Sequence, residues 1–135
     1  MYLSEICIEK IVSFLKREIN PIFIYLFGSF AKGEGREDSD VDLAIYTNDN
    51  KTSYELFILA NHLSFEIKKD VDLIDLKNLN TVFAAQIVGN KEVLYCEDEV
   101  FMGNYDIKIL KEYAKLNEER KVVLDAIERE GKVYG

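Results

Sequence analysis

The stretch IFIYLFGSFAKGEGREDSDVDLAIY, residues 22–46, decides how this chain folds. Residues 22–27 are β-branched and aromatic, and the run is too short for a helix, so it predicts a buried strand that stops at Gly28. Residues 41–46 predict a second strand in the same way. The loop between them carries glycines, two serines and acidic residues in a fixed order. Most of the remaining chain is expected to support this loop.

Gly28 and Ser29 stand where the first strand ends. A glycine at this place lets the backbone approach a bulky ligand closely. The neighbouring N–H groups and the Ser29 hydroxyl can then hold phosphate oxygens, especially where the residues from Ser29 onward open a helical turn. A plain turn after a strand accounts for a Gly-Ser pair equally well, so the pair by itself is weak evidence.

Asp40 and Asp42 place two carboxylates at the start of the second strand. Alternation along a strand points both to the same face, where two ionised groups repel each other. A divalent cation removes this conflict, and Mg²⁺ is commonly held by one or two carboxylates together with substrate phosphates. The alternative is a strand end with two solvated aspartates. The pair beside a phosphate-holding turn favours a metal and nucleotide site.

The loop as a whole resembles the motif of the polymerase-β-like nucleotidyltransferase superfamily, and most closely its MNT-type minimal nucleotidyltransferases. The residues that carry the resemblance are Gly28, Ser29, Ala31, Gly33, Ser39, Asp40, Asp42 and Leu43. The resemblance implies that Gly28, Ser29 and Ser39 bind the nucleotide and that Asp40 and Asp42 bind metal. One position departs from the pattern, because Phe30 stands where arginine is frequent, and Lys32 or Arg36 would then have to contact phosphate.

The composition describes one globular domain without a nucleic-acid-binding surface. The chain has 135 residues, 48% of them hydrophobic, with 17 basic against 25 acidic residues and a net charge of −8. Its basic residues are scattered, whereas tight nucleic-acid binding depends on clustered cations. We therefore expect no direct nucleic-acid partner, and a basic protein partner is compatible with this charge.

Other chemistry-bearing residues are few. Cys7 and Cys96 are isolated, which predicts two reduced thiols, and His62 has no catalytic partner in the pattern. No stretch is long enough to span a membrane, and no signal-peptide pattern is present. A cytoplasmic protein is the expectation.

Further elements follow from hydrophobic periodicity and from capping residues. We expect helices over residues 3–18, 52–68 and 79–88, the last ending at Gly89-Asn90, strands over residues 70–76 and 92–95, and a long helix over residues 101–129 that ends at Gly131. The fold class is therefore α/β (α+β), a small mixed sheet flanked by helices. The resemblance specifies the polymerase-β-like nucleotidyltransferase fold.

A third carboxylate is expected from the run DVDLIDL, residues 70–76. Two-metal phosphoryl transfer uses such a group to ligate an ion and to help accept the proton of the attacking hydroxyl. The family resemblance aligns Asp72 with this residue. Asp70 points to the same face and is the alternative, whereas Asp75 points the other way and is expected to be structural.

Residues 1–98 are expected to form the nucleotidyltransferase core and residues 99–135 a helical extension that packs on the core or on a partner, within a single domain. The extension resembles the tail of the MntA antitoxins of HEPN/MNT toxin–antitoxin systems through Tyr105, Leu110, Arg120 and Gly131. This resemblance implies a hetero-oligomer with a cognate HEPN-domain toxin.

The resemblance implies an enzyme that transfers AMP from ATP, with two Mg²⁺ ions, to a tyrosine hydroxyl of the HEPN ribonuclease toxin and so neutralises it. Asp40, Asp42 and Asp72 would be its catalytic and metal-binding residues. Three alternatives stay open: a binding module that covers the toxin without catalysis, a nucleotidyltransferase acting on a small-molecule hydroxyl, and an RNA-tailing enzyme. The absence of a basic track disfavours the last.

Overall fold

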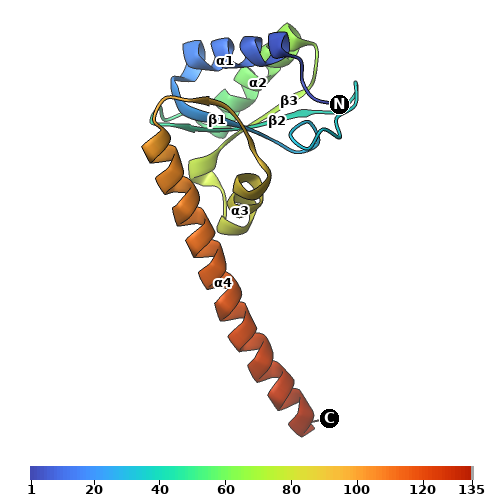
Figure 1. Ribbon diagram of the computed structural model, residues 1–135, viewed down its shortest axis with the longest axis vertical. Coiled ribbons are helices and arrows are strands. Elements are labelled where there is room, and N and C mark those ends of the chain that lie inside the picture. The colour runs from blue at the N-terminus through green and yellow to red at the C-terminus, as the bar shows by residue number, and fades with distance from the viewer. Residues whose placement is uncertain (135) are drawn as a thin grey trace.

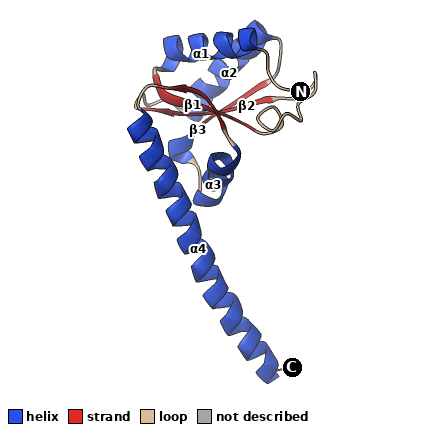
Figure 2. Cartoon of the chain, viewed as in Figure 1, coloured by secondary structure: helices blue, strands red, loops and turns tan. Residues whose placement is uncertain are grey.

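The computed structural model describes residues 1–134 as a four-stranded sheet with helices on both faces and one long projecting helix (Figures 1 and 2). In chain order, the elements are α1 (Glu5–Ile19), β1 (Pro21–Phe27), β2 (Val41–Thr47), α2 (Ser53–Ile67), β3 (Val71–Asp75), a 3₁₀ turn η1 (Leu76–Asn78), α3 (Thr81–Asn90), β4 (Glu92–Cys96) and α4 (Glu99–Tyr134). The expected mixed sheet flanked by helices, with a C-terminal helix, is confirmed.

The sheet has the strand order β3-β2-β1-β4. β1 lies at its centre and pairs antiparallel with β2 and β4, whereas β2 pairs parallel with β3. The register sets Asp42 directly beside Phe27 on β1 and beside Asp72 on β3. Pro21 is tolerated on the central strand because it occupies the first position, where a missing N–H disturbs the ladder least.

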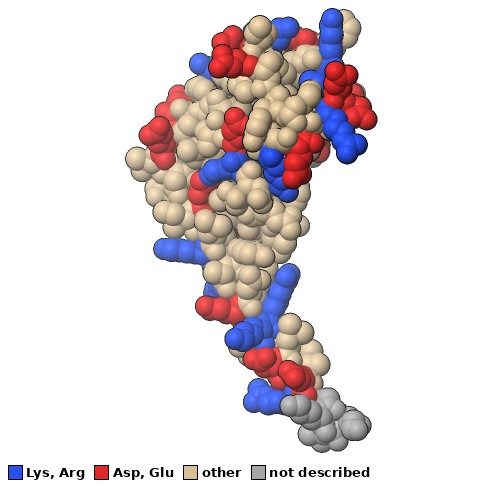
Figure 3. Space-filling view, turned by 45° about the vertical axis from the view of Figure 1, so that its right-hand side comes forward, with Lys and Arg blue, Asp and Glu red and all other residues tan. Residues whose placement is uncertain are grey.

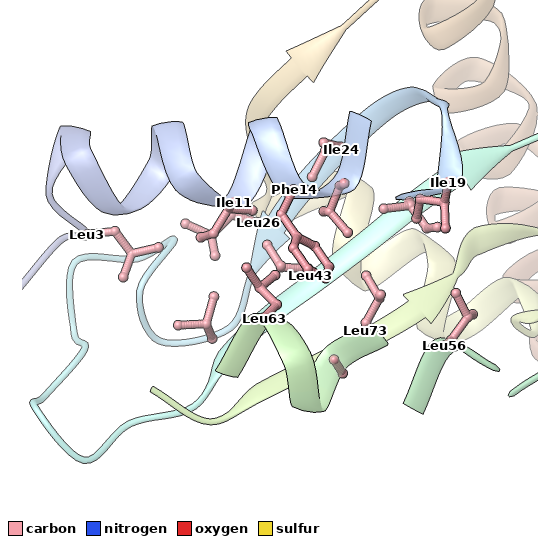
Figure 4. Close-up of a cluster of buried hydrophobic side chains, with 14 of the residues drawn as sticks. Leu3, Ile11, Phe14, Ile19, Ile24, Leu26, Leu43, Leu56, Leu63 and Leu73 are labelled. Carbon is pink, nitrogen blue, oxygen red and sulfur yellow. The ribbon is translucent and has the colours of Figure 1, made fainter. Parts of the chain in front are cut away.

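One face of the sheet carries α1 and α2 and holds the larger hydrophobic core (Figure 4). Alternate residues of β1 and β2 point into this layer, and fully buried helix residues meet them from above. The buried members include Ile11, Leu15, Ile24, Leu26, Val41, Leu43, Ile45 and Leu63. The loop joins this core through Phe30, whose side chain is completely buried.

The opposite face carries α3 and the first half of α4. Phe23, Tyr25 and Ala44 point into it from the strands, and aromatic contacts link Phe23 and Tyr46 to Phe101 and to Tyr105. Asp42 shares this orientation, because it alternates with residues of the α1/α2 layer. Asp42, and Asp72 beside it, therefore lie on the side of α3 and α4.

Capping residues account for where the first helices begin. Ser4 Oγ accepts from the Cys7 N–H at the start of α1. Thr52 and Glu55 form a reciprocal capping box at the start of α2. These two N-termini agree with the sequence prediction.

The third helix ends at Gly89-Asn90 as predicted, although without a glycine cap, whereas the predicted end of the last helix is wrong. Gly89 lies inside α3, which ends at Asn90, and the next residue, Lys91, is extended instead of left-handed. Gly131 does not end α4, which continues to Tyr134. A glycine ends a helix only where it adopts the left-handed cap, and a single internal glycine costs only about 1 kcal/mol.

The remaining structural expectations concern single residues. Asp75 is buried and its carboxylate accepts from the Lys77 N–H at 2.9 Å, so it is structural as expected. Cys7 and Cys96 are free thiols. Over residues 1–134, none of the helices combines the length and apolar character needed to cross a membrane.

A partly buried charge cluster fixes α4 to the sheet. Tyr25 on β1 donates a hydrogen bond to Asp106 on α4 at 2.6 Å, and Lys91 forms an ion pair with the same carboxylate. Lys91 also donates to the Tyr25 hydroxyl at 3.1 Å and lies over its ring. Burial and the Asp106 hydrogen bond raise the pKa of Tyr25, so this phenol remains a donor throughout the physiological range.

We predict that Asp106→Ala lowers the free energy of unfolding by about 1–3 kcal/mol, because it leaves the Lys91 ammonium and the Tyr25 hydroxyl without their shared acceptor. Urea denaturation measures the change. The control is Glu18→Gln, which breaks the exposed ion pair with Arg17 and should change stability by less than about 1 kcal/mol. Equal effects of the two substitutions would contradict the anchoring role of Asp106.

Candidate active site

The site is built where β1 ends and β2 and β3 begin. Gly28 follows β1 with φ +73°, a left-handed conformation that L side chains rarely adopt. A Cβ added to Gly28 would lie 2.2 Å from Asp42 Oδ2. The glycine therefore leaves room for the Asp42 carboxylate to lie against the end of the neighbouring strand.

Residues 29–33 turn back over the end of the sheet. The Lys32 and Glu34 N–H groups donate to the Ser29 carbonyl, and the Gly33 N–H donates to the Phe30 carbonyl. These are consecutive hydrogen-bonded turns that do not continue into an α-helix. The later part of the loop is closed by Ser39, whose Oγ accepts from the Arg36 N–H at 2.8 Å.

The register brings two of the three expected carboxylates side by side. Asp42 and Asp72 are paired neighbours on parallel strands, so their side chains share one face. Burial, the Asp72 charge and then the Asp40 charge raise the pKa of Asp42 to about 6. Asp70 precedes β3, and its backbone carbonyl accepts from the Val41 N–H.

The carboxylates are grouped loosely. Within residues 1–134, no three or more His, Cys, Asp or Glu side chains already surround a common point at metal-ligand spacing. Mg²⁺ is usually held by one or two carboxylates with phosphate oxygens completing its shell. The arrangement therefore suits an ion that arrives with a phosphate-bearing ligand better than a permanent structural ion.

A cleft of about 340 Å³ opens between the loop and α3. The three carboxylates do not line it, but Asp42 is the neighbour of two residues that do, Phe27 and Gly28. Gly28 and Lys32 line it from the loop side. Its other wall comes from α3. The rings of Phe27 and Phe83, which both line the cleft, meet edge to face with their centroids 5.9 Å apart. The residues that α3 contributes are Phe83, Gln86, Ile87 and Asn90.

The α3 wall was missed by the sequence reasoning, because the strand-loop-strand motif does not reach it. The one available signal was spacing: Phe83, Gln86 and Asn90 lie three and four residues apart and so share a helix face. Phe30, which departs from the family pattern, is a loop anchor in the structure, with Gly35 and the Lys69 ammonium against its ring. Lys32 is the cation that lines the cleft.

Residues 9–100 match the family described as "Polymerase beta, Nucleotidyltransferase". The chain belongs to this polymerase beta nucleotidyltransferase family. The matched range contains the whole sheet, the loop and the three carboxylates. The resemblance expected from residues 28–43 is therefore confirmed at the level of the family.

Relatives of this nucleotidyltransferase include proteins with a named activity. It is 32% identical over 123 residues to the protein adenylyltransferase MntA of Shewanella oneidensis, covering 88% of this chain and 86% of the relative. It is 30% identical over 92 residues to the protein adenylyltransferase MntA of Thermococcus cleftensis, covering 65% of this chain and 91% of the relative.

Solved structures give the same picture. A chain from a toxin–antitoxin crystal structure with AMP-PNP superposes with a TM-score of 0.80 at 30% identity, covering 89% of this chain and 97% of the other. A chain from the structure of a tri-AMPylated Shewanella oneidensis HEPN toxin in complex with its MNT antitoxin gives 0.77 at 27% identity, with coverages of 93% and 98%. Much of the long C-terminal helix therefore has a counterpart in these nucleotidyltransferases.

We predict that Gly28→Ala destabilises this nucleotidyltransferase by at least about 1–2 kcal/mol, the cost of a left-handed non-glycine residue, and displaces the Asp42 carboxylate. Thermal unfolding and nucleotide binding measure the two effects. Gly103→Ala is the matched control, because a Cβ at this helical position meets nothing within 4 Å. It should be neutral or stabilise by about 0.5–1 kcal/mol. Retention of both stability and binding by Gly28→Ala would refute the close-approach role.

The raised pKa of Asp42 predicts a pH-dependent stability. Between pH 3.8 and about pH 6, the folded chain holds a proton on Asp42 that the unfolded chain has released. The contribution of Asp42 to the free energy of unfolding therefore falls as pH rises through this window and stays unfavourable above it. Asp42→Asn should be more stable than the wild type at pH 7.5 in EDTA, and the difference should vanish below pH 4.

Thermal melts of both proteins across this pH range measure the effect, and Asp49→Asn on an exposed turn is the control. The Asp49 variant should follow the wild-type pH profile. An Asp42→Asn variant that is less stable than the wild type at pH 7.5 in EDTA would contradict the like-charge account of the site.

Proposed function

We propose that this chain is the antitoxin of a HEPN/MNT pair and transfers AMP from ATP to a tyrosine hydroxyl of its cognate HEPN ribonuclease toxin, neutralising it. The observation that carries the proposal is the pairing of Asp42 with Asp72 beside Gly28 and the cleft. The activity named for its relatives, and the AMP-PNP and AMPylated-toxin complexes of similar structures, support the same reaction. Such a pair would act in the cytoplasm as a hetero-oligomer.

The nucleotide is proposed to bind across the end of β1. Backbone N–H groups at Gly28 and Ser29 and the Ser29 hydroxyl hold the β- and γ-phosphates, since no side chain at Gly28 blocks their approach. Lys32 supplies the positive charge that the family pattern places at the position of Phe30. The Ser39 hydroxyl oxygen accepts from the Arg36 N–H, so its own proton is free to be donated to the nucleotide.

Two Mg²⁺ ions are proposed at the carboxylates, and the site residues fit them. Asp42 is half-buried beside Asp72 and Asp40, so its ionised form is disfavoured until a cation offsets the repulsion. Asp40 and Asp42 would hold the two ions, and Asp72 would be a further ligand of one of them. When bound, such ions stabilise the charge on the transferring phosphoryl group and on the leaving pyrophosphate.

The reaction is an in-line substitution at the α-phosphorus of ATP. The acceptor tyrosine oxygen forms a new bond to this phosphorus while the bond to the pyrophosphate oxygen breaks. Tyrosine has a pKa near 10, so its proton must be removed as the bond forms, and Asp72 is proposed to help accept it. The cleft walls orient the nucleotide and exclude water from the reacting phosphorus.

The added AMP explains how the transfer would neutralise the toxin. Each adenylate places negative charge on the toxin surface, and at a ribonuclease site it competes with the RNA phosphates that must bind there. Neutralisation would then outlast dissociation of the antitoxin. A module that merely covers its toxin would not have this property.

The test is intact mass spectrometry of the HEPN toxin after incubation with this chain, ATP and Mg²⁺. We expect the toxin mass to rise by one AMP or by several, and peptide mapping to place AMP on tyrosine. Asp42→Asn should transfer at least about a hundredfold more slowly, since two-metal catalysis loses a ligand. Asp49→Asn, which removes a carboxylate far from the cleft, should keep full activity.

Each other outcome points to a different function. A stable complex with no mass increase would support a purely covering antitoxin. Neither complex nor mass increase would favour transfer to a small-molecule hydroxyl. Full activity of Asp42→Asn would contradict the assignment of this residue.

A further inference from the structure

Helix α4 is much longer than the core on which it packs. Its first half meets the sheet and α3 through Phe101, Tyr105, Ile109 and Tyr113, which follow one another every four residues. The second half extends away from the core on the side of α3 (Figures 1 and 2). Among the side chains that the structure describes, those of α4 beyond Tyr113 belong to neither hydrophobic core.

The packing face of α4 continues along this free half. Residues at three- and four-residue steps after Tyr113 form what we call the distal stripe: Leu116, Arg120, Val123, Leu124 and Ile127. Val123, Leu124 and Ile127 are 57%, 63% and 58% exposed. A hollow of about 400 Å³ covers the part of the stripe from Leu116 to Leu124, and Glu119 also lines it. Uncharged surface is visible between the charges of the projecting helix (Figure 3).

A solvated helix has no need of these side chains. Valine and isoleucine are weaker helix formers than the Lys, Glu and Arg that surround them, so they do not serve helix propensity. Aliphatic residues grouped on one exposed face indicate a surface that another chain covers.

The stripe connects to the active site through a chain of shared wall residues. Phe83 and Gln86 line the nucleotide cleft and also a second hollow, which reaches Leu116 and Arg120 on α4. Leu116 and Arg120 in turn line the distal hollow. One continuous track therefore runs from Gly28 across α3 to the distal stripe.

A second copy of this chain does not suit the stripe. A stable interface buries about 800 Å² on each partner, and a few aliphatic side chains on one helix face cannot supply that area alone. A partner that must also reach the carboxylates covers the whole track, which is larger than the stripe alone. Because Asp42 and Asp72 face the α3/α4 side of the sheet, such a partner lies on the correct side for its hydroxyl to be modified.

We propose that the distal stripe of α4 is the docking surface for the AMP-accepting protein, which extends from there over α3 to the carboxylates. The inference rests on the proposed function, because the acceptor is the protein modified there. The chemistry of the stripe calls for a helix on that protein with apolar residues at three- and four-residue spacing. Opposite charges at Glu119 and Arg120 set its direction along the groove.

The experiment compares two neighbouring valines. Val123 lies on the stripe, whereas Val122 is 68% exposed and about 100° away around the helix. We expect Val123→Glu to raise the KM for the HEPN toxin at least about tenfold, with kcat at saturating toxin unchanged, because docking is lost and chemistry is kept. Ile127→Glu should behave alike, and Val122→Glu should match the wild type. Circular dichroism confirms that each variant keeps its helix.

The same proteins separate failure of docking from failure of the proposed function. Calorimetric titration with toxin measures complex formation without any AMP transfer. Val123→Glu should raise the dissociation constant of the complex about tenfold. If the wild-type chain binds the toxin but transfers no AMP, the proposed function fails. The dissociation constant of the Val123→Glu variant then still shows whether the distal stripe is the docking surface. Unchanged binding by Val123→Glu, or equal weakening by Val122→Glu, would overturn the docking surface. A dimer of the chain alone that Val123→Glu dissolves would overturn it too.

Discussion

The structure depends on placing the Asp42 carboxylate against the Gly28 backbone and beside Asp72. The parallel register of β2 and β3 makes the two acidic residues neighbours, and the absent Cβ of Gly28 leaves room for them. The first feature works against stability, since like charges repel. The second is open only to glycine, because a left-handed residue is strained with any other side chain. Such a cost is retained where a ligand of opposite charge relieves it, which is the usual property of a binding site.

The rest of the fold holds this site rigid and adds what it lacks. The α1/α2 core secures the strands from one side, and Phe30 ties the loop to that core. On the other side, α3 supplies the second wall of the cleft. The Tyr25, Lys91 and Asp106 cluster then fixes the first half of α4 to the sheet.

The local parts of this arrangement could be predicted from sequence, because they depend on neighbours in the chain. Hydrophobic patterning predicted the two strands that flank the loop, and the capping residues placed the starts of α1 and α2. The cleft wall on α3 and the Asp106 anchor could not be predicted in this way. Tyr25 and Asp106 are 81 residues apart, and only the folded sheet brings them together. Sequence also left the role of the long helix open, and its projection became apparent only once the limits of the core were known.

The most direct test of the central claim is the position of divalent ions in crystals of this chain grown with AMP-PNP and Mn²⁺, located by the anomalous scattering of manganese. The account predicts two ions, both ligated by Asp40 or Asp42, one of them also by Asp72, with phosphate oxygens completing their shells. Nucleotide bound in the cleft with manganese only elsewhere, or with no contribution from Asp42, would contradict it.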